Sequence, residues 1–440
     1  MMNLFGAQSS RRLTAIALNL MLVGGTASVL SACSEPGAAP DGDQATSPGG
    51  EGGLKLGALL PATGDLSAIG QNMPLAVQLA VDTINDCGGV NGQPVTVVIE
   101  DDQTDPTAGV SAMTKLAEVD QVAGVVGSFA SSVSSAAIPI AVKNKVMMIS
   151  PGSTSPVFTQ QAQQGNYQGY WARTAPPDTY QAQALAALVK QEGFEKISTV
   201  VINNDYGVGF EKVFVESVEN NGGSVMNRDN PVRYDPKAAT LDTEAAQAFA
   251  NNPNAIAAVL YADTGSVLVQ AAYKQGLTQG VTWLLTDGVY SDDFVQKVGK
   301  GEDGNSLLAG ALGTVPGADG KALDDFTALW KDATQKEVTA FVPHTYDATV
   351  LLMLAAEAAK ANTGEAIQSK IRAVAAGSGE EVTDACEALA MVREGKAINY
   401  QGASGNVDID ENGDVIGSYD VWTVKPDGTL TVVDKVTPGQ

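Results

Sequence analysis

The 440-residue sequence contains a single histidine, three cysteines and few basic residues. With His344 as its only histidine, it cannot form a histidine-rich metal site, and a histidine-based catalytic triad would depend on that one residue. The 26 Lys and Arg are outnumbered by 50 Asp and Glu, which gives a formal net charge of −24. No nucleic-acid partner is expected, because phosphate binding needs a basic surface. Hydrophobic residues make up 44% of the chain, which is enough to build large cores and excludes general disorder.

Acidic residues are absent from residues 1–32, where two adjacent arginines precede the apolar run 13–30. A basic segment followed by a short apolar run predicts an export signal peptide. The run ends in the sequence Leu-Ser-Ala-Cys at 30–33, which resembles the bacterial lipobox. We therefore expect residues 1–32 to be a lipoprotein signal peptide and Cys33 to carry the lipid. An ordinary signal peptide followed by a chance cysteine is the alternative.

Residues 33–53 are rich in Gly, Pro, Ala, Ser and acidic residues and lack apolar periodicity. This composition is typical of a flexible tether. No later segment contains the roughly 18 uninterrupted apolar residues that a transmembrane helix needs. An anchor followed by a tether predicts an exported lipoprotein held on the periplasmic or outer face of the cell membrane.

From residue 54 onward, short apolar runs alternate with segments of helical periodicity. Strands are expected at 54–60, 95–99, 123–126 and 146–149, with helices at 71–85, 106–118 and 132–143. After 173–177 the alternation begins again, with helices at 179–192 and 208–220 and strands at 197–202, near Ser224, and at 256–260, 281–285 and 307–312. Helices dominate 322–392, and 406–433 alternates like a hairpin.

Such alternation predicts parallel sheets with crossover helices. The expected fold class is α/β, with two doubly wound parallel-sheet lobes. The Pro-rich break near Ala175 and the Gly/Pro segment 313–317 are candidate crossings between the lobes.

Small polar residues follow two predicted strands, at the end where ligands bind in an open parallel sheet. They occupy 127–132 and 150–154. Their hydroxyls and backbone N–H groups, with a helix N-terminus after the first segment, suit a carboxylate and need no basic residue. Helix capping explains either segment alone, but two such segments one strand apart favour an anion site.

Three further polar residues lie at strand ends or helix starts. Asp287 could hold an ammonium group, or it could simply form an Asp-Gly turn. Tyr206 could cover a ligand or pack at a helix start. For Asp178, helix N-capping is the favoured interpretation.

Three other motifs are not expected to carry chemistry. Residues 408–413 begin like a calcium loop, but the twelfth position is Tyr419, where a bidentate Glu is needed, so a β-turn is favoured. Residues 207–209 are too short for a dinucleotide fingerprint. His344 has no nucleophile beside it in the sequence, which favours a structural role. We therefore expect no metal, no cofactor and no enzyme activity.

Several short segments are weak motifs alone, but their order and spacing make the set specific. They are 57–60 with 63–64, 84–85 with 88–92, 149–156, 205–207, 346–348 and 402–405. Together they resemble the bacterial periplasmic solute-binding proteins of ABC transporters, in the branched-chain amino-acid (Leu/Ile/Val-binding) family with the type I fold. The resemblance runs from about residue 54 to 428.

The resemblance implies two lobes joined by three crossings, with the ligand between them. Lobe 1 would comprise 54–175 and about 315–395, and lobe 2 would comprise 176–314 and about 396–440. It places Cys87 and Cys386 in one lobe. In an exported protein these cysteines could form a disulfide, or they could be two buried thiols.

The resemblance also implies roles for individual residues. Ser131, Gly152 and Thr154 would hold the ligand's α-carboxylate, with Ser153 beside them among the expected ligand-binding residues. Asp287 would hold the α-ammonium where Glu is usual, and Asp178 would make a second polar contact near it. Tyr206 would be the aromatic residue that covers the ligand. Ile69 falls where an aromatic residue often lines the side-chain pocket. Tyr261 aligns only approximately with the family's ligand-binding residues.

The function implied is a lipid-anchored receptor that binds an amino acid, branched-chain or a similar small polar solute. It would act as a monomer and deliver its ligand to the permease subunits of an ABC importer. Two alternatives use the same clamp: a lipoprotein that senses ligand and signals to a membrane partner, and a receptor for amides or urea-like solutes.

Overall fold

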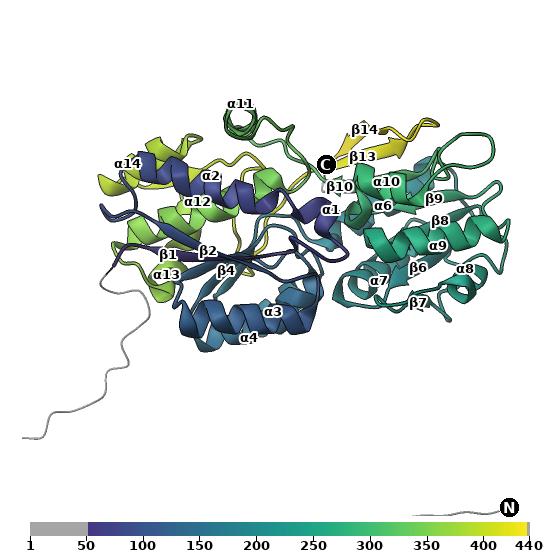
Figure 1. Ribbon diagram of the computed structural model, residues 1–440, viewed down its shortest axis with the longest axis horizontal. Helices are drawn as coiled ribbons and strands as arrows, with labels where there is room; N and C mark the ends of the chain where they lie inside the picture. Colours follow the sequence, from purple (N-terminus) through teal and green to yellow (C-terminus); the bar gives the residue numbers. More distant parts are fainter. Residues whose placement is uncertain (1–51, 438–440) are drawn as a thin grey trace, which may run out of the picture. The chain divides into compact units, whose positions relative to one another are not determined.

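The computed structural model describes residues 52–437 and shows two β-sheets with helices packed against them (Figure 1). The predicted signal peptide 1–32, the predicted lipidation site Cys33 and all but the last two residues of the predicted tether lie outside the described residues. Within the described part, no helix is both long enough and apolar enough to span a bilayer.

The first sheet is entirely parallel, with the strand order β2-β1-β3-β4-β5. Its strands are β1 (Lys55–Leu60), β2 (Thr96–Asp101), β3 (Gly124–Gly127), β4 (Met147–Ser150) and β5 (Trp171–Arg173). Between them run α1 (Ser67–Gly70), α2 (Met73–Asp86), α3 (Pro106–Thr114) with a π-helical turn (Lys115–Val119), α4 (Ser131–Lys143) and α5 (Val157–Gln163). Strands β3 and β4 are wholly buried, which explains their continuous apolar runs.

The second sheet is mixed, with the order β14-β13-β10-β9-β8-β6-β7. Its strands are β6 (Ile197–Ile202), β7 (Val232–Tyr234), β8 (Ala255–Val259), β9 (Thr282–Leu285), β10 (Leu312–Pro316), β13 (Tyr419–Val424) and β14 (Leu430–Val436). Its helices are α6 (Asp178–Gln191), α7 (Asp205–Asn220), α8 (Asp242–Ala248), α9 (Ala262–Lys274), a 3-10 turn (Asp287–Val289) and α10 (Asp292–Val298). Only β13 and β14 run antiparallel to their neighbours.

After β10 the chain returns to the first sheet. It forms α11 (Leu323–Thr334), α12 (Val342–Ala359), α13 (Gly364–Ala375), β11 (Glu380–Val382), α14 (Ala385–Arg393) and β12 (Ile398–Tyr400). Helix α12 is buried from Val342 to Ala356 because α2, α13, α14 and the first sheet surround it. We call the first sheet with its helices lobe 1 and the second sheet with its helices lobe 2.

The predicted fold class is confirmed, since two doubly wound sheets are connected by three crossings. The first crossing follows β5 and the second follows β10. We place the third after Ser404 rather than near residue 396. The backbone N–H groups of Ala403 and Ser404 still donate to the buried Asp347 carboxylate of α12, at 3.0 and 2.7 Å.

Several predicted elements were wrong. The strand expected at 307–312 is displaced to β10, and most of the expected crossing 313–317 therefore belongs to that strand. Gly313 does not break it; a Cβ there would lie 2.2 Å from the Trp422 ring, so the glycine permits close packing. Near Ser224 only one isolated bridge forms, between Val225 and Ile197. Residues 406–418 form no strand, and the short β5 and β7 were missed.

Candidate functional site

The predicted carboxylate-binding segments meet at the ends of β3 and β4. Ser131 begins α4, and its Oγ accepts a hydrogen bond from Ser155 N at 3.3 Å. The carbonyl of Thr154 accepts from Asp178 N at 2.8 Å, which ties the β4 loop to the start of α6 in lobe 2. The structure thus brings Ser131, Thr154 and Asp178 into one buried group, in which the Thr154 hydroxyl makes no hydrogen bond.

The other two residues of the β4 loop support its shape. Gly152 lies against Phe129, since a Cβ at this position would be 2.1 Å from that ring. The hydroxyl of Ser153 is already engaged inside lobe 1, with Ser134 Oγ at 2.8 Å and the Ser128 carbonyl at 3.0 Å. The structure therefore gives the Ser153 side chain a role in joining two loops, which differs from the predicted ligand contact.

Lobe 2 contributes a second cluster around Asp287, which follows β9. Its Oδ1 accepts hydrogen bonds from Gln181 Nε2 at 2.8 Å and from Tyr206 Oη at 2.9 Å. Gln181 lies three residues after Asp178, hence on the same face of α6. Tyr206 also lies 2.7 Å from Thr286 Oγ1, so a short chain of hydrogen bonds fixes its ring.

Asp178 and Asp287 are both buried, and among the described residues neither forms an ion pair with a basic side chain. Burial raises the pKa of Asp287 to about 6, although the hydrogen bonds from Tyr206 and Gln181 oppose this. Burial and the neighbouring Asp287 raise the pKa of Asp178 well above its usual range. The Thr154 hydroxyl is close enough to lower that pKa slightly, but neither Asp178 oxygen makes a hydrogen bond of normal geometry. Arg173 also lowers the pKa of Asp178 electrostatically, but it forms no ion pair with either carboxylate, so the two desolvated carboxylates suit a cationic group.

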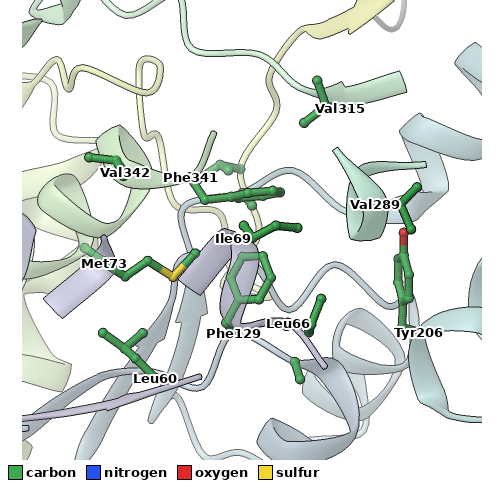
Figure 2. Close-up of a cluster of buried hydrophobic side chains, with 14 of the residues drawn as sticks. Leu60, Leu66, Ile69, Met73, Phe129, Tyr206, Val289, Val315, Phe341 and Val342 are labelled. Atoms are coloured by element: carbon green, nitrogen blue, oxygen red, sulfur yellow. The ribbon is translucent and has the colours of Figure 1, made fainter. Parts of the chain in front are cut away.

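Aromatic and aliphatic side chains surround these polar groups. The rings of Tyr206 and Tyr261 stack at 5.8 Å with 12° between their planes. Ile69, in α1, belongs to a cluster of buried side chains that also contains Phe129 and Phe341 (Figure 2). The rings of Phe129 and Phe341 meet edge to face at 4.8 Å.

Sequence reasoning missed two residues of this region. Gln181 could have been found from its spacing to Asp178, because positions i and i+3 of a helix share a face. Phe341 carries no such local signal, since it precedes α12 in a left-handed conformation with φ of 65°.

The calcium-like loop at 408–413 and the cysteines Cys87 and Cys386 have structural explanations. Asp410 accepts hydrogen bonds from the backbone N–H groups of Asn412 and Asp414, at 2.8 and 2.9 Å, so its loop is closed by its own backbone. The described residues contain no cluster of His, Cys, Asp and Glu that could hold a metal ion. The structure joins Cys87 to Cys386 as a disulfide, with the Cα atoms 5.7 Å apart.

The family model described as "Receptor family ligand binding region" matches residues 72–427. The chain belongs to this family. Leu/Ile/Val-binding relatives and structural neighbours that are type I periplasmic binding proteins of ABC transporters bear out the resemblance that the sequence motifs predicted.

Two curated relatives illustrate the range of the family. This solute-binding protein is 26% identical over 365 residues to the chemotactic signal transduction system substrate-binding protein BasB of Halobacterium salinarum, covering 81% of this chain and 83% of BasB. It is 26% identical over 322 residues to the Leu/Ile/Val-binding protein homolog 1 of Brucella melitensis, covering 72% and 81% of the two chains.

Solved structures give the same fold. The leucine-binding protein LivK of Thermotoga maritima matches with a TM-score of 0.72 and 26% identity, over 88% of this chain and 99% of LivK. The isoleucine complex of LivJ from Streptococcus pneumoniae matches with a TM-score of 0.71 and 21% identity, over 88% and 100% of the two chains. A solute-binding protein from Rhodopseudomonas palustris bound to 4-hydroxybenzoate has a TM-score of 0.69 and 21% identity, over 87% and 97%.

Proposed function

We propose that this solute-binding protein captures a free amino acid, branched-chain or a similar small polar solute, between its two lobes. The observation that carries the proposal is the pair Asp178 and Asp287. Both carboxylates are buried, and neither has a basic partner among the described residues. A ligand ammonium would supply the missing charge. In the empty site, a proton held by the pair has to replace it.

The polar groups divide naturally between the two ends of a zwitterion. The ammonium would contact Asp287 and Asp178. The carboxylate would receive hydrogen bonds from the hydroxyls of Ser131 and Thr154 at the N-terminus of the 13-residue helix α4, whose dipole favours negative charge. No Lys or Arg is needed there, which fits the scarcity of basic residues in the sequence.

The ligand's side chain would lie against Ile69 and the stacked rings of Tyr206 and Tyr261. The usual aromatic is absent at Ile69, and Asp287 is one methylene shorter than the usual Glu. Both changes leave more room around the ligand than the family pattern provides. We therefore propose an amino acid without restricting the side chain to leucine, isoleucine or valine, and we keep amides and urea-like solutes as alternatives.

Loops of the two lobes meet beside this site. Ser155 Oγ in lobe 1 donates to the carbonyl of Asp205, the first residue of α7 in lobe 2, at 2.8 Å. Closure of the lobes would exclude water and strengthen every polar contact with the ligand. This geometry suits binding and release without chemical change, so we propose no enzyme activity.

We further propose that Cys33 carries a lipid and that the protein hands its ligand to the permease of an ABC importer. The lipobox-like sequence at 30–33 supports the anchor, and the structural neighbours that are named as transporter solute-binding proteins support the importer. Sensing is the second candidate, because BasB is named as part of a chemotactic signal transduction system. Reconstitution would separate them: stimulation of a permease–ATPase complex by the loaded protein supports transport, and its absence favours sensing.

A thermal-shift and calorimetry panel tests the binding proposal directly. It should contain the common amino acids, their amides, urea and benzoates. An amino acid present at 100 times its dissociation constant should stabilise the protein by about 2.7 kcal/mol. If no amino acid, amide or urea-like compound shifts the melting temperature, the proposed function is wrong.

A further inference from the structure

A cavity lies near the polar site, between lobe 2 and the start of α12. Its volume is about 490 Å³, which is within the range of small-molecule sites. Its walls come from the residues after the 3-10 turn Asp287–Val289, the end of β10, α11 and the segment around the start of α12. They include Tyr290, Ser291, Val315, Thr339, Phe341 and His344.

His344 is the unusual member of this lining. Its side chain is 1% exposed, and its Nδ1 has no hydrogen-bond partner. Burial lowers its pKa to about 4, so the imidazole is neutral and carries one donor and one acceptor. Its backbone carbonyl is engaged by Thr174 Oγ1 at 2.8 Å, which holds the residue in place at the first crossing. A buried polar atom without a partner is costly, and a ligand group could satisfy it.

The lining of the cavity is linked to the proposed ammonium site through neighbouring residues. Tyr290 N donates to the carbonyl of Asp287 at 3.0 Å. Val315 follows Thr314, whose carbonyl accepts from Gln181 at 3.0 Å, and Gln181 also holds Asp287.

Val315 and Phe341, which line the cavity, also belong to the buried cluster that contains Ile69 and Tyr206 (Figure 2). A ligand whose ammonium lies at Asp287 could therefore direct its side chain past Phe341 toward His344.

We propose that this cavity is the far end of the ligand site and that His344 hydrogen-bonds to an uncharged polar group, a hydroxyl or a carboxamide, at the end of the bound solute's side chain. This inference rests on the proposed amino-acid function. The wall mixes polar side chains with apolar ones such as Val315, Leu323 and Phe341, and a neutral imidazole beside apolar groups suits an uncharged polar end better than a charged one, which would lose its hydration there. Asp292 and Asp420 at the rim add to the penalty for an anionic end.

Matched ligand pairs test the inference by calorimetry on the purified protein. In each pair, tyrosine with phenylalanine and glutamine with methionine, the polar member should bind at least about tenfold more tightly. His344→Phe should remove that preference, so that the two members of each pair bind equally tightly. His344→Asn, which keeps a donor and an acceptor, should retain part of it. Tighter binding of the apolar members, or of lysine or glutamate, overturns the inference.

A second measurement needs no variant, because His344 is the only histidine in the chain. Selective ¹⁵N labelling of histidine then gives one pair of ring signals. Tyrosine or glutamine should shift the Nδ1 signal, whereas phenylalanine or methionine should not. Equal shifts, or none, contradict the inference. If leucine binds but the pairs show no preference, only this inference fails; if no amino acid binds at all, the proposed function fails with it.

Discussion

The carboxylate of Asp65 accepts a hydrogen bond of 2.9 Å from Thr264 Oγ1, and it also accepts one from the backbone N–H of Asp263. Asp65 lies in the loop after β1 in lobe 1, whereas Asp263 and Thr264 form the first turn of α9 in lobe 2. One lobe thus caps a helix of the other. Because the two partners belong to different lobes, separation of the lobes would break these hydrogen bonds.

Asp65→Ala should weaken ligand binding, although Asp65 is not one of the proposed ligand contacts. The variant loses an inter-lobe cap, an interaction of about 0.5–2 kcal/mol, so the dissociation constant should rise about 2- to 30-fold. Calorimetry would measure the affinity, and small-angle scattering should show a larger radius of gyration for the empty variant. Asp263→Ala is the matched control. It removes an exposed ion pair with Lys297 and a like charge near Asp65, leaves the backbone N–H in place and should bind no more weakly than the unchanged protein. Equal losses of ligand affinity in both variants would argue that the hydrogen bonds between Asp65 and the first turn of α9 do not stabilise the closed lobes.

Asp287→Asn should weaken amino-acid binding by about 2–5 kcal/mol, because it removes the charge facing the ammonium while keeping the side-chain size. The same change should raise the melting temperature of the empty protein, since Asp178 then has no buried like charge beside it. Differential scanning calorimetry with and without ligand measures both effects. Asp324→Asn is the control, because Asp324 is exposed on α11; it should change neither the ligand affinity nor the melting temperature. Unchanged affinity in Asp287→Asn would show that the ammonium is held elsewhere.

Ligand binding should tighten as the pH rises from 5 to 7. The pKa of Asp287 is about 6 in the empty protein, and that of Asp178 is raised as well. A cationic ammonium favours the ionised carboxylates and must displace a proton when the pair is protonated. Below pH 6 the affinity should therefore fall by up to about tenfold per pH unit for each proton released. Titrations in buffers of different ionisation enthalpy would detect the proton. An affinity that is constant from pH 5 to 7 contradicts this allocation.

The same pKa shifts fix the sign of the stability change in the empty protein. Between the unfolded value of 3.8 and about 6, native Asp102, Asp287 and Asp347 bind more protons than the unfolded chain does, and they outweigh His344, whose pKa is lowered to about 4 and which binds fewer. Stability of the empty protein should consequently fall as the pH rises through this window and level off above it. Urea unfolding at pH 4.5, 5.5 and 7 would show the slope.

Removing the bridge between Cys87 and Cys386 should cost about 2–5 kcal/mol of stability, because it closes a long chain segment between α2 and α14. Cys87→Ser, Cys386→Ser and the double variant should lose the same amount, since each removes the same bond. Losses that add in the double variant would indicate two independent thiols. Guanidinium unfolding with and without reductant measures the effect, and ligand affinity should stay normal because the bridge lies within lobe 1.

Sequence patterns could predict which strand ends carry the candidate site residues, but they could not predict which of these residues come into contact. Asp287 and the 150–154 segment stand directly after strands, and the strand ends of a parallel sheet share one edge, so their place at the candidate site could be predicted from position. Phe341 could not be placed this way, because it reaches the site from a segment that returns from the second crossing. Ser153 looked equivalent to Thr154 in the sequence. Only the fold shows that its hydroxyl faces Ser134 within lobe 1.

The same distinction holds for the fold. Buried strands such as β3 and β4 appear as continuous apolar runs because both faces are covered. The segment 307–312 has a similar apolar run, but Leu308 and Ala311 are buried in turns rather than in a strand. Local hydrophobicity reports burial, and it does not distinguish a buried turn from a buried strand.

Arg173 joins the loop after β4 to Asp414, which follows the third crossing. Loss of Arg173 should therefore affect both stability and ligand binding. The guanidinium is fully buried, lies 2.7 Å from an Asp414 carboxylate oxygen and donates to the carbonyls of Ser153 and Ser155 at 3.0 Å each. These two carbonyls flank Thr154. Arg173→Met leaves Asp414 buried without a counter-charge and should cost about 3–5 kcal/mol of stability.

Pairing the change with Asp414→Leu separates the two effects. The double variant removes both charges, so it should recover most of the stability lost in Arg173→Met. It should not recover affinity, because the Ser153 and Ser155 carbonyls still lack the donors that hold the Thr154 loop in place for the ligand's carboxylate. Chemical unfolding and calorimetric titration of the single and double variants measure the two quantities independently. If affinity returns together with stability, Arg173 serves only the fold and does not position the loop.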